Sequence, residues 1–536
     1  DMLPEAHYHE RLNQAIQNRE EGCEYLIIAP DDPAILAWAD TLKQFRLRQG
    51  IPTKIVTTTE CGSNDTEDVR NYILNAYYSW AIPPAAVLLF GENHKGAPEF
   101  GIKPFNFISP PSYGHAYTYP SDNPFADMNG DSIPDLAVSR IVAKYPSEYQ
   151  QQVEKLIQYE LNPPTDPHYY DHPVITSGYE EDKWFLITSQ IINSYFCDKL
   201  ERHPTNNYMV FDQGNPFSDP PDSLWSTGEN TQAVLDYFGP NGLQYIPSSV
   251  GNLDHWGSMT DPQALIDAMS EGGFLTLYRD HSSEDSWACP MFDAQDIAQI
   301  HADWPTFIFS IGCLTNNYWD NWTTCLSETF LKAEPGAIGV IGAASVTYSH
   351  FNDIITWGML DYLWPDFMPT LGSQTVTDFA YPAYALVAGK LFLSQQSFRP
   401  YASWPTETEK TLNLFNFLGE TYLNLFTEVP QPLNVAAAAY HSENLPEYTI
   451  TAEEGTLVCI ARGEEILHLV LATGQAQTFA LPTMAAGEQF DVTVTHPGRI
   501  RFHRNVTVIP ATGPYMIMEG YLLRDEIGRA SCRERV

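Results

Sequence analysis

Two short runs of apolar residues in the middle of the chain are too continuous to be half-exposed strands. The first is GGFLTLYRDH at 272–281, and the second is TFIFSIGC at 306–313. Such runs are typical of strands that are buried on both faces of a parallel sheet. The first run ends at His281 and the second at Cys313. Because catalytic groups collect at the carboxyl ends of strands in open α/β sheets, we expect both side chains at that edge.

Strand-like and helix-like segments alternate through most of the chain, and this order predicts a parallel sheet flanked by helices. A boundary is expected at NPPTDP, residues 162–167, after which a second run of the same kind begins. The predicted strands are 24–30, 53–59, 85–92, 135–141, 173–178, 243–246 and 337–345, besides the two runs above. The predicted helices are 34–49, 66–80, 146–161, 185–200, 262–269, 323–332, 351–364 and 384–396, and the region 203–229 is predicted to be loop-rich.

After Pro432 the pattern changes to short strands separated by turns. The segments EYTITA, TLVCIAR, LHLVLAT, QTFALP, QFDVTVTH and RIRFHRNVTVI follow one another with Gly and Pro between them, which is typical of a β-sandwich. We therefore predict a lead-in at 1–23, α/β subdomains at 24–165 and 166–431, a β-sandwich at 432–509, the start of a further segment at 510–525 and a tail at 526–536.

Size and charge narrow the class of protein. The chain has 536 residues, 43% of them hydrophobic and 13% aromatic, which is enough for several cores. It carries 28 basic and 67 acidic side chains, a formal net charge of −39. This balance argues against nucleic acid or an anionic membrane as partner. No apolar run is long enough for a membrane span.

The two ends of the sequence are unusual. The chain begins DMLPEAHYHE without an initiator Met or a signal peptide, which is expected of an internal fragment or a processed form. The tail EIGRASCRERV resembles an in-frame translation of a sequencing-adapter oligonucleotide and takes no part in the fold prediction. With Cys532 set aside, the remaining cysteines lie far apart and form no CxxC pair, so no zinc site is predicted.

A cysteine and a histidine at neighbouring strand ends suit thiol chemistry. We expect the imidazole of His281 to take the thiol proton of Cys313, because the thiolate is the nucleophile, and later to protonate the leaving amine. Backbone N–H groups at Cys313 and Ser282 are candidates to hold the oxyanion. The structural alternative is that the cysteine is a small buried hydrophobe and the histidine a satisfied strand-end group.

Stretches around both residues resemble the catalytic core of gingipain-type cysteine peptidases, which belong to the caspase-like clan. In that family a His in the setting Y-x-G-H-G-S-E-x-x-W is followed by the nucleophilic Cys at the end of a later strand, and here Cys313 follows His281 by 32 positions. The matching stretches are YRDHSSEDSW at 278–287, PTFIFSIGC at 305–313, CLSETFL at 325–331, GAIGVIGAAS at 336–345, ADMNGDSIPDLAVSRI at 126–141 and NFLGETYLNLF at 416–426.

The resemblance covers roughly 24–509 and implies a fold and an activity. The implied fold is a caspase-like, gingipain-like α/β catalytic domain of two subdomains with mostly parallel sheets, followed by an immunoglobulin-like β-sandwich. The implied activity is a cysteine endopeptidase with Cys313 as nucleophile and His281 as general base. Residues matched to the oxyanion and substrate-pocket region, where the family's Trp borders the pocket, are Ser282, Ser283, Glu284 and Trp287.

A third catalytic group and two departures also follow from the resemblance. Gingipain-type enzymes orient the His with an acidic residue after the first strand of the second subdomain. Glu180 is our choice for it and Glu181 the second choice, while the alternative is that both are solvated loop carboxylates. The family's glycines beside the His are Asp280 and Ser282 here. Glycine allows close backbone approach, so Ser282 is expected to crowd the oxyanion, whereas Asp280 is expected to hold an imidazolium.

The Asp-rich loop DMNGDSIPD has the alternating oxygen side chains of a calcium loop but lacks the later bidentate Glu. Structural calcium is one reading, and secreted members of the family often hold it; an Asp/Asn/Gly turn before a strand is the other. The candidate ligands are Asp127, Asn129, Asp131 and Asp135.

The sequence thus predicts an endopeptidase that acts on protein or peptide substrates and needs no cofactor for its chemistry. We expect a secreted or cell-surface bacterial protein, with secretion machinery or the cell surface as partners and no nucleic acid or membrane span. The alternative is a catalytically impaired surface or adhesion module that keeps the same shell. The helix sequence FLITSQIINSYF offers no match for the pocket Asp of Arg-specific members, so basic-residue specificity is not predicted.

Overall fold

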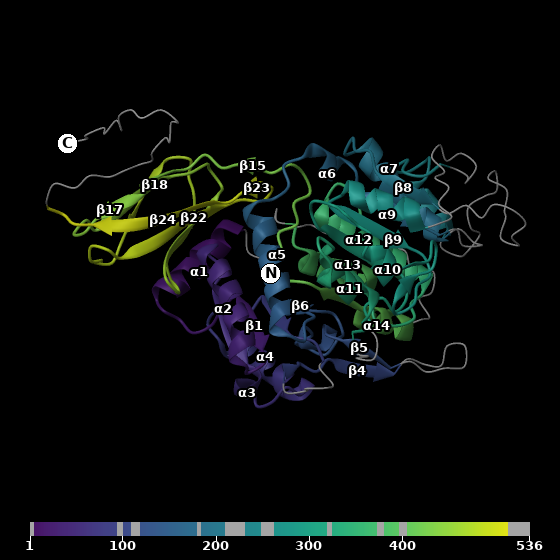
Figure 1. Cartoon of the computed structure of the whole chain (residues 1–536), viewed down its shortest axis with the longest axis horizontal. Coiled ribbons are helices and arrows are strands. Elements are labelled where there is room, and N and C mark those ends of the chain that lie inside the picture. The colour runs from purple at the N-terminus through teal and green to yellow at the C-terminus, as the bar shows by residue number, and fades with distance from the viewer. Residues whose placement is uncertain are drawn as a thin grey trace, which may run out of the picture.

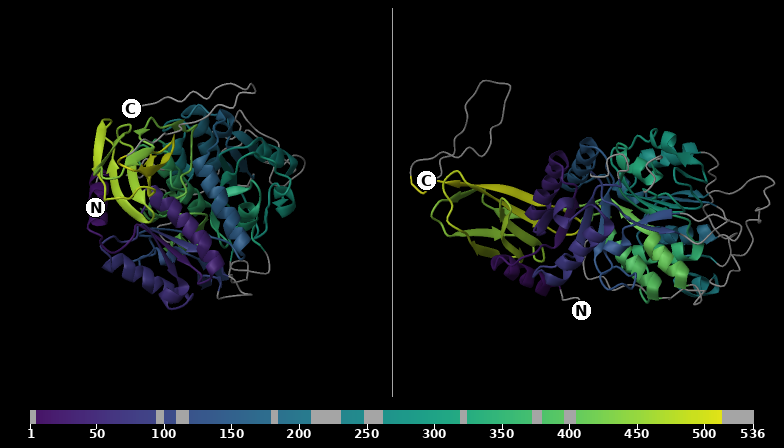
Figure 2. Two further views of the ribbon diagram at one scale, coloured as in Figure 1. Left: turned by 60° about the vertical axis from the view of Figure 1, so that its left-hand side comes forward. Right: turned by 90° about the horizontal axis from the view of Figure 1, so that it is seen from below.

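The computed structural model describes residues 5–93, 100–108, 118–178, 184–208, 231–247, 262–318, 324–371, 380–395 and 405–512. These residues form an α/β body with a smaller all-β part at one end of the long axis (Figure 1). In the right-hand view of Figure 2 the all-β part again lies at one end, beside the first helices of the chain.

The first part of the chain alternates strands and helices, as predicted. The strands YLIIA at 25–29 and AVLLF at 86–90 are buried at every position, because helices cover both faces of the sheet. The elements are α1 (Glu5–Gln17), β1 (Tyr25–Ala29), α2 (Pro33–Arg48), β2 (Thr53–Thr57), α3 (Thr58–Cys61), α4 (Thr66–Ser79), β3 (Ala86–Phe90), β4 (Phe105–Ile108), β5 (Thr118–Ser121), β6 (Ala137–Ile141) and α5 (Pro146–Leu161).

The second part repeats this pattern and contains both apolar runs. Residues 306–311 are buried throughout, and so are 275–279. The elements are α6 (Pro167–Asp171), β7 (Val174–Ser177), α7 (Trp184–Asp198), β8 (Thr205–Tyr208), α8 (Thr231–Phe238), α9 (Pro262–Glu271), β9 (Leu275–Arg279), β10 (Ser286–Trp287), β11 (Phe292–Asp293), α10 (Ala294–Ile297), β12 (Thr306–Ile311), α11 (Leu326–Lys332), β13 (Ala337–Ala343), α12 (Ser349–Leu363), α13 (Pro382–Gln395), α14 (Pro405–Leu414) and β14 (Phe415–Leu418).

Both parts contribute to one continuous sheet with the order β2-β1-β3-β6-β14-β13-β12-β9-β7-β8. All neighbouring pairs with a described register are parallel except β13 and β14, which are antiparallel. The sheet therefore consists of two parallel halves that run in opposite directions and meet at this pair. The carboxyl ends of β13, β12, β9, β7 and β8 consequently share one edge, where His281 and Cys313 follow their strands.

Alternate residues of each strand point to opposite layers of helices. Tyr25 and Ile27 pack in the core that includes residues of α2, whereas Leu26 and Ile28 pack in the core that includes residues of α4. The same alternation continues in the second half, where α7, α12 and α13 contribute to the first core and α9, α10 and α11 to the other face. This two-sided burial is the physical reason for the unbroken apolar runs.

One predicted strand is wrong. Residues 243–246 form a turn after α8, in which the N–H groups of Leu243 and Tyr245 donate to the carbonyls of Tyr237 and Phe238, at 2.7 and 2.8 Å. Gln244 has a φ of 64°, a left-handed conformation that a strand cannot accommodate. The apolar residues of this segment are buried in the core instead of forming a strand. Conversely, β8 and α14 lie in segments for which no element was predicted.

The segment after residue 431 forms a β-sandwich. Its strands make a three-stranded sheet, β16-β18-β21, and a five-stranded sheet, β17-β24-β22-β19-β20, and residues of both sheets share one core. The strands are β15 (Gln431–Pro432), β16 (Ala436–Ala437), β17 (Tyr440–Ser442), β18 (Glu447–Thr451), β19 (Leu457–Arg462), β20 (Glu465–Leu471), β21 (Ala476–Ala480), β22 (Gln489–Thr495), β23 (Arg499–Ile500) and β24 (Phe502–Ile509).

The sandwich is packed against α1 and α2. Leu12 and Leu47 from these helices lie in one buried cluster with Cys459 and Leu469 of the sandwich. The guanidinium of Arg501 lies 4.6 Å from the centre of the Phe45 ring, a cation–π contact. The first helices of the chain therefore bury apolar surface together with its last strands.

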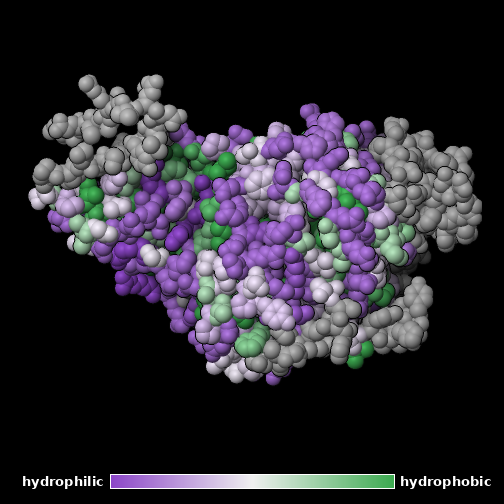
Figure 3. Space-filling model, viewed as in Figure 1, coloured by the Kyte–Doolittle hydropathy of each residue, from purple (hydrophilic) through white to green (hydrophobic). Residues whose placement is uncertain are grey.

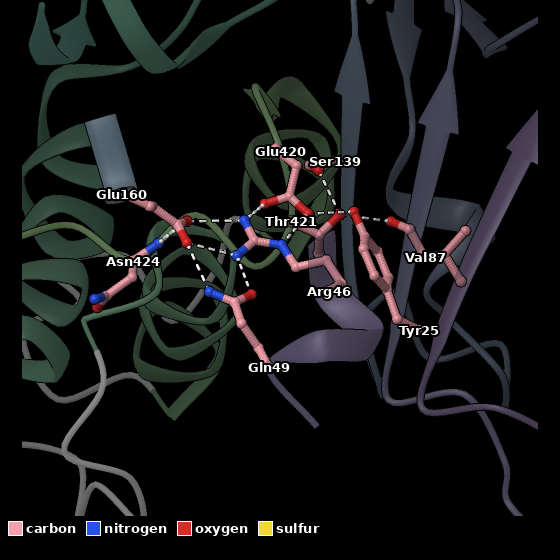
Figure 4. Close-up of polar contacts among 9 residues, drawn as sticks. All are labelled: Tyr25, Arg46, Gln49, Val87, Ser139, Glu160, Glu420, Thr421 and Asn424. Carbon is pink, nitrogen blue, oxygen red and sulfur yellow. Dashed lines mark hydrogen bonds and ion pairs between the residues drawn. The ribbon is translucent and has the colours of Figure 1, made fainter. Parts of the chain in front are cut away.

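A buried ionic network joins three distant parts of the chain (Figure 4). Arg46 of α2 donates through two nitrogens to both carboxylate oxygens of Glu160 in α5, at 2.7 and 2.8 Å. The same guanidinium donates to Glu420 after β14, and the Tyr25 hydroxyl donates to that carboxylate at 2.7 Å. Burial raises the pKa of Glu420 above its ordinary value, while Arg46 opposes this shift.

Hydrophilic residues cover most of the described surface on the face seen in Figure 3. This agrees with the strongly acidic composition. Among the described helices, we find none with the length and apolar character needed to cross a membrane.

Candidate active site

The two predicted reactive residues follow adjacent strands. β9 and β12 pair in parallel, and the last residue of β9, Arg279, is opposite the last residue of β12, Ile311. His281 and Cys313 each lie two positions beyond this pair. Because neighbouring strands are separated by roughly 5 Å, the two loops leave the sheet side by side. The structure thus brings the predicted pair to one edge.

A hydrogen bond and a close contact hold these two loops together. The Ser282 hydroxyl donates to the Cys313 carbonyl oxygen at 2.6 Å. A Cβ on Gly312 would lie 2.2 Å from the Ser282 hydroxyl oxygen and 2.7 Å from the Asp280 carbonyl oxygen. Only glycine therefore fits before the candidate nucleophile while the loop of His281 lies against it.

Cys313 is half-buried, and the segment that follows β13 contacts its sulfur. The Thr347 N–H donates to the sulfur at 3.4 Å, and the Thr347 hydroxyl oxygen lies 3.7 Å from it. The next residue along the chain, Leu314, has a φ of 65°, so the backbone turns sharply directly after Cys313. Cys313 forms no disulfide among the described residues.

His281 is solvent-exposed and lies in a loop that is fixed from below. Its backbone N–H donates to a carboxylate oxygen of Asp280 at 2.6 Å, and its ring makes an edge-to-face contact with Phe185 of α7, with 5.1 Å between centroids. The Tyr278 hydroxyl donates to the His281 carbonyl oxygen. The imidazole is therefore accessible to a substrate while its backbone is tied to the sheet.

Asp280 is the buried acid beside His281. Only 4% of it is exposed, and burial raises the pKa of its carboxyl to about 6, although the N–H and the ring of His281 pull in the opposite direction. A Cβ on Gly178, at the end of β7, would lie 1.8 Å from a carboxylate oxygen of Asp280. The glycine at 178 thus makes room for this acid.

The residues after His281 form a compact hairpin. The Ser283 N–H donates to the Ser286 carbonyl oxygen at 2.9 Å, and the Ser283 hydroxyl lies 2.7 Å from the Ser286 hydroxyl. Glu284 accepts a hydrogen bond from the Asn317 side chain at 2.8 Å, which links the hairpin to the segment after Cys313. These two residues therefore hold the loop in shape.

Trp287 lies beneath the hairpin and has no exposed surface. Its ring stacks on Tyr278 with 4.4 Å between centroids and 5° between planes. Its indole N–H donates to the Ser310 hydroxyl at 2.9 Å. In this conformation the indole supports the site from within the core.

Two backbone donors near Cys313 are open. Within the described part of the chain, the N–H groups of Cys313 and Ser282 donate to no protein acceptor. The pairing of Ser282 with Trp287 is a bridge whose hydrogen bonds come from the neighbouring residues, so the Ser282 N–H points away from it. Both predicted oxyanion donors therefore lack an acceptor among the described residues. Glu180 and Glu181, the candidates for a third catalytic group, lie outside the described residues.

The Asp-rich loop before β6 uses its oxygen atoms within the loop. The two carboxylate oxygens of Asp127 accept hydrogen bonds from three backbone N–H groups, those of Gly130, Asp131 and Ser132, at 2.7 to 3.2 Å. The side chains of Asn129, Asp131 and Asp135 each accept one backbone N–H as well. Among the described residues, no group of three or more His, Cys, Asp or Glu has the arrangement of a metal site. These residues form a hydrogen-bonded turn, and the calcium site suggested by the sequence is not confirmed.

The sequence prediction missed Thr347 and Lys410, which also belong to this edge. Lys410 lies in α14, its ammonium is 5.1 Å from the centre of the Tyr348 ring, and it interacts electrostatically with Cys313. Nothing in the sequence pointed to either residue, because both reach the site through strand pairing between distant segments.

Comparison with known proteins agrees with this architecture. The sequence model of peptidase family C25 matches residues 18–426. The chain resembles the crystal structure of the Arg-specific cysteine proteinase gingipain R (RgpB), with a TM-score of 0.69 and 14% identity over 92% of this chain and 99% of that one. It also resembles the complex of the Porphyromonas gingivalis RgpB pro- and mature domains, with a TM-score of 0.67 and 14% identity over 90% and 100% of the chains. No curated protein sequence matches the chain.

Proposed function

The chain belongs to peptidase family C25, the gingipain family, and we propose that Cys313 and His281 carry out its cysteine peptidase chemistry. The observation that carries this proposal is the pairing of β9 with β12, which delivers both side chains to the same sheet edge. The bond from Ser282 to the Cys313 carbonyl supports it, because it fixes one loop against the other. Cys313 is half-buried and His281 is exposed, which suits a site that a peptide must reach.

In the proposed reaction His281 takes the proton of the Cys313 thiol, and the thiolate attacks the carbonyl carbon of a peptide bond. The N–H groups of Cys313 and Ser282 stabilise the negative oxygen that forms. The C–N bond breaks, and the imidazolium gives its proton to the leaving amine. Water, deprotonated by His281, then cleaves the thioester, which releases the acid and restores the thiol. Every group used belongs to the chain, so this chemistry requires no cofactor.

The supporting residues have proposed roles of different kinds. We assign Glu180 the orientation of His281, with Glu181 as the second choice, on the family pattern alone. Ser283 and Glu284 keep the hairpin in shape, and Trp287 supports it from the core. Ser283, Glu284 and Trp287 therefore support the site and take no part in bond making or breaking.

The biological setting extends the proposal. We propose that the protein is secreted or displayed on a bacterial cell surface, that it cleaves proteins or peptides there, and that secretion machinery handles it. The family pattern and the net charge of −39 support this setting. We further propose that 24–165 and 166–431 are subdomains of one catalytic unit and that 432–509 is an immunoglobulin-like domain. Calcium is not part of the proposal, because the Asp127 carboxylate accepts hydrogen bonds from backbone N–H groups of its own turn.

The decisive experiment compares Cys313→Ala with Cys197→Ala, which removes another half-buried thiol, on α7. Cleavage of a mixed peptide library should fall at least about 10³-fold in the first variant and stay unchanged in the second. An iodoacetamide probe should label Cys313 in the folded wild-type protein. If Cys313→Ala cleaves at the wild-type rate, the proposed nucleophile is wrong. A folded wild-type protein that neither cleaves nor is labelled at Cys313 would favour the impaired adhesion module.

A further inference from the structure

Lys410 is a buried lysine whose ammonium has no hydrogen-bond acceptor within the part of the chain that the structure describes. Its side chain is in the middle of α14 and only 7% of the residue is exposed. Among the described residues, its Nζ makes no hydrogen bond. An ammonium removed from water without such a partner costs several kcal/mol, so an unpaired lysine of this kind is uncommon in a folded protein.

The topology of the sheet brings Lys410 to the candidate active site. α14 leads directly into β14, and β14 pairs antiparallel with β13, so that Phe415 lies opposite Ala343. The end of α14 is therefore held at the carboxyl edge of β13, where the Ala344 N–H donates to the Leu414 carbonyl oxygen at 3.0 Å. This is the edge at which the neighbouring strand β12 ends and Cys313 follows.

A short chain of contacts connects the ammonium to the nucleophile. The backbone and hydroxyl of Thr347 contact the Cys313 sulfur, and the adjacent Tyr348 ring lies 5.1 Å from the Lys410 Nζ. Lys410 also interacts electrostatically with Cys313 itself. These contacts link the ammonium, through Tyr348 and Thr347, to the sulfur at which a substrate would place its scissile bond.

Nearby groups compensate the charge only in part. The Tyr348 ring offers a cation–π contact, and Glu407, one turn earlier in α14, attracts the ammonium without a hydrogen bond to it. Burial lowers the pKa of Lys410 below its ordinary value. Arg279, a second cation of this edge among the described residues, is already paired with Asp353 at 2.8 Å. Lys410 is therefore the cation near Cys313, among the described residues, that retains capacity for an anion.

We propose that Lys410 is a specificity-determining residue that binds a substrate carboxylate next to the scissile bond. The inference rests on the proposed function of Cys313. The carboxylate comes from an Asp or Glu side chain beside the cleaved bond or from the free carboxyl end of a peptide. A local cation is needed for this purpose, because the net charge of −39 repels acidic substrates as a whole.

The test measures kcat/KM for matched peptides with the wild-type protein, Lys410→Met, Lys410→Arg and Lys410→Glu. Wild-type protein should prefer Asp or Glu over Asn or Gln beside the scissile bond by about 10- to 100-fold, a range expected for one charge-assisted contact. Lys410→Met should abolish this preference and leave neutral peptides within a few-fold of wild type. Lys410→Arg should retain the preference. Lys410→Glu should prefer peptides with Lys or Arg beside the scissile bond.

Lys199→Met is the matched control, since Lys199 also lies over a tyrosine ring, 5.9 Å from that of Tyr245. It should leave the preference unchanged. Peptides with free and amidated carboxyl ends separate the two sources of carboxylate. A site for the end of a peptide binds the free end better than the amidated end, whereas a site for a side chain binds both equally. A preference for free ends would assign Lys410 to the peptide terminus, and a preference for internal Asp or Glu would assign it to a side chain.

Two results would overturn the inference while the proposed function stands. One is a wild-type protein that cleaves neutral and acidic peptides equally well. The other is a Lys410→Met variant, folded by its melting curve, that loses the same factor on every peptide, which would mean that the lysine acts on Cys313 and not on substrate. Failure of the proposed function differs from both, because then Cys313→Ala would cleave as well as wild type.

Discussion

Asp280 shows how a single side chain changes the site relative to the family pattern. The residue replaces a glycine, yet its carboxylate points inward to Gly178 and accepts the His281 N–H, so it does not project toward the substrate. Ser282, the second replacement, turns its hydroxyl to the Cys313 carbonyl. Both departures therefore add contacts beneath and between the loops, and the Ser282 N–H stays available.

The buried carboxyl of Asp280 predicts a pH dependence of stability. Its pKa is raised to about 6 in the folded protein, above the ordinary value of 3.8. An acid shifted upward favours folding most when it is protonated, and this contribution is lost as the pH rises from about 4 through about 6. The free energy of unfolding of wild type relative to Asp280→Asn should fall by about 2 kcal/mol between pH 4 and pH 7.

Urea unfolding at both pH values, in a Cys313→Ala background to prevent self-cleavage, measures this difference. Other titrating groups cancel in the comparison, because both proteins contain them. Equal pH dependence in the two proteins would show that the Asp280 carboxyl is ionised as easily as in the unfolded chain.

At the scale of elements, the sequence predicted the strands that are buried on both faces. It missed the elements whose position depends on contacts between distant segments. The apolar runs that became β9 and β12 could be recognised, because two-sided burial leaves a local mark. β8, TNNY, carries no such mark, since it is a polar strand at the edge of the sheet. α14 and its Lys410 were missed for a related reason: their place beside Cys313 depends on the pairing of β14 with β13, which no local pattern shows.

The loop of Asp127 shows a local pattern with two interpretations, a calcium site and a hydrogen-bonded turn, and the structure describes the contacts of the turn. The oxygen spacing is that of a calcium loop, but the same side chains satisfy backbone N–H groups of their own turn. Asx turns and calcium loops use the same residue types, so spacing alone does not separate them.

This reading predicts that the loop depends on Asp127 and not on calcium. Asp127→Ala leaves the N–H groups of Gly130 and Ser132 without their acceptor, while that of Asp131 keeps Asn129, and should lower the free energy of unfolding by about 1–3 kcal/mol. Removal of calcium with EDTA, or its addition at millimolar concentration, should leave the melting temperature of the wild-type protein unchanged. Asn129→Ala is the milder control, because it removes one acceptor. A melting temperature that rises with calcium in wild type but not in Asp127→Ala would restore the metal site.

At the scale of the whole molecule, the Arg46 network holds two helices of the first half against the loop after β14. Arg46 comes from the second helix of the chain, Glu160 from the helix that ends the first half, and Glu420 from the loop after the last strand of the sheet. The strand before Glu420, β14, joins the two halves and carries the candidate active site on its other side through β13 and β12. The network therefore anchors the central strand on which the site depends.

Arg46 compensates two buried carboxylates, those of Glu160 and Glu420. Removal of Arg46 should therefore lower the stability more than removal of either carboxylate. Arg46→Met should lower the free energy of unfolding by about 3–5 kcal/mol, since it leaves Glu160 and Glu420 buried and uncompensated. The variant should regain stability as the pH falls, because uncompensated buried acids have raised pKa values and favour folding when protonated. The triple variant Arg46→Met/Glu160→Gln/Glu420→Gln removes the unpaired charge and should recover much of the loss at neutral pH. Denaturant unfolding of the wild type, the single variant and the triple variant measures both effects. A single variant that is no less stable than the triple variant would mean that the carboxylates reach water or another cation. In that case β14 would be anchored by packing alone.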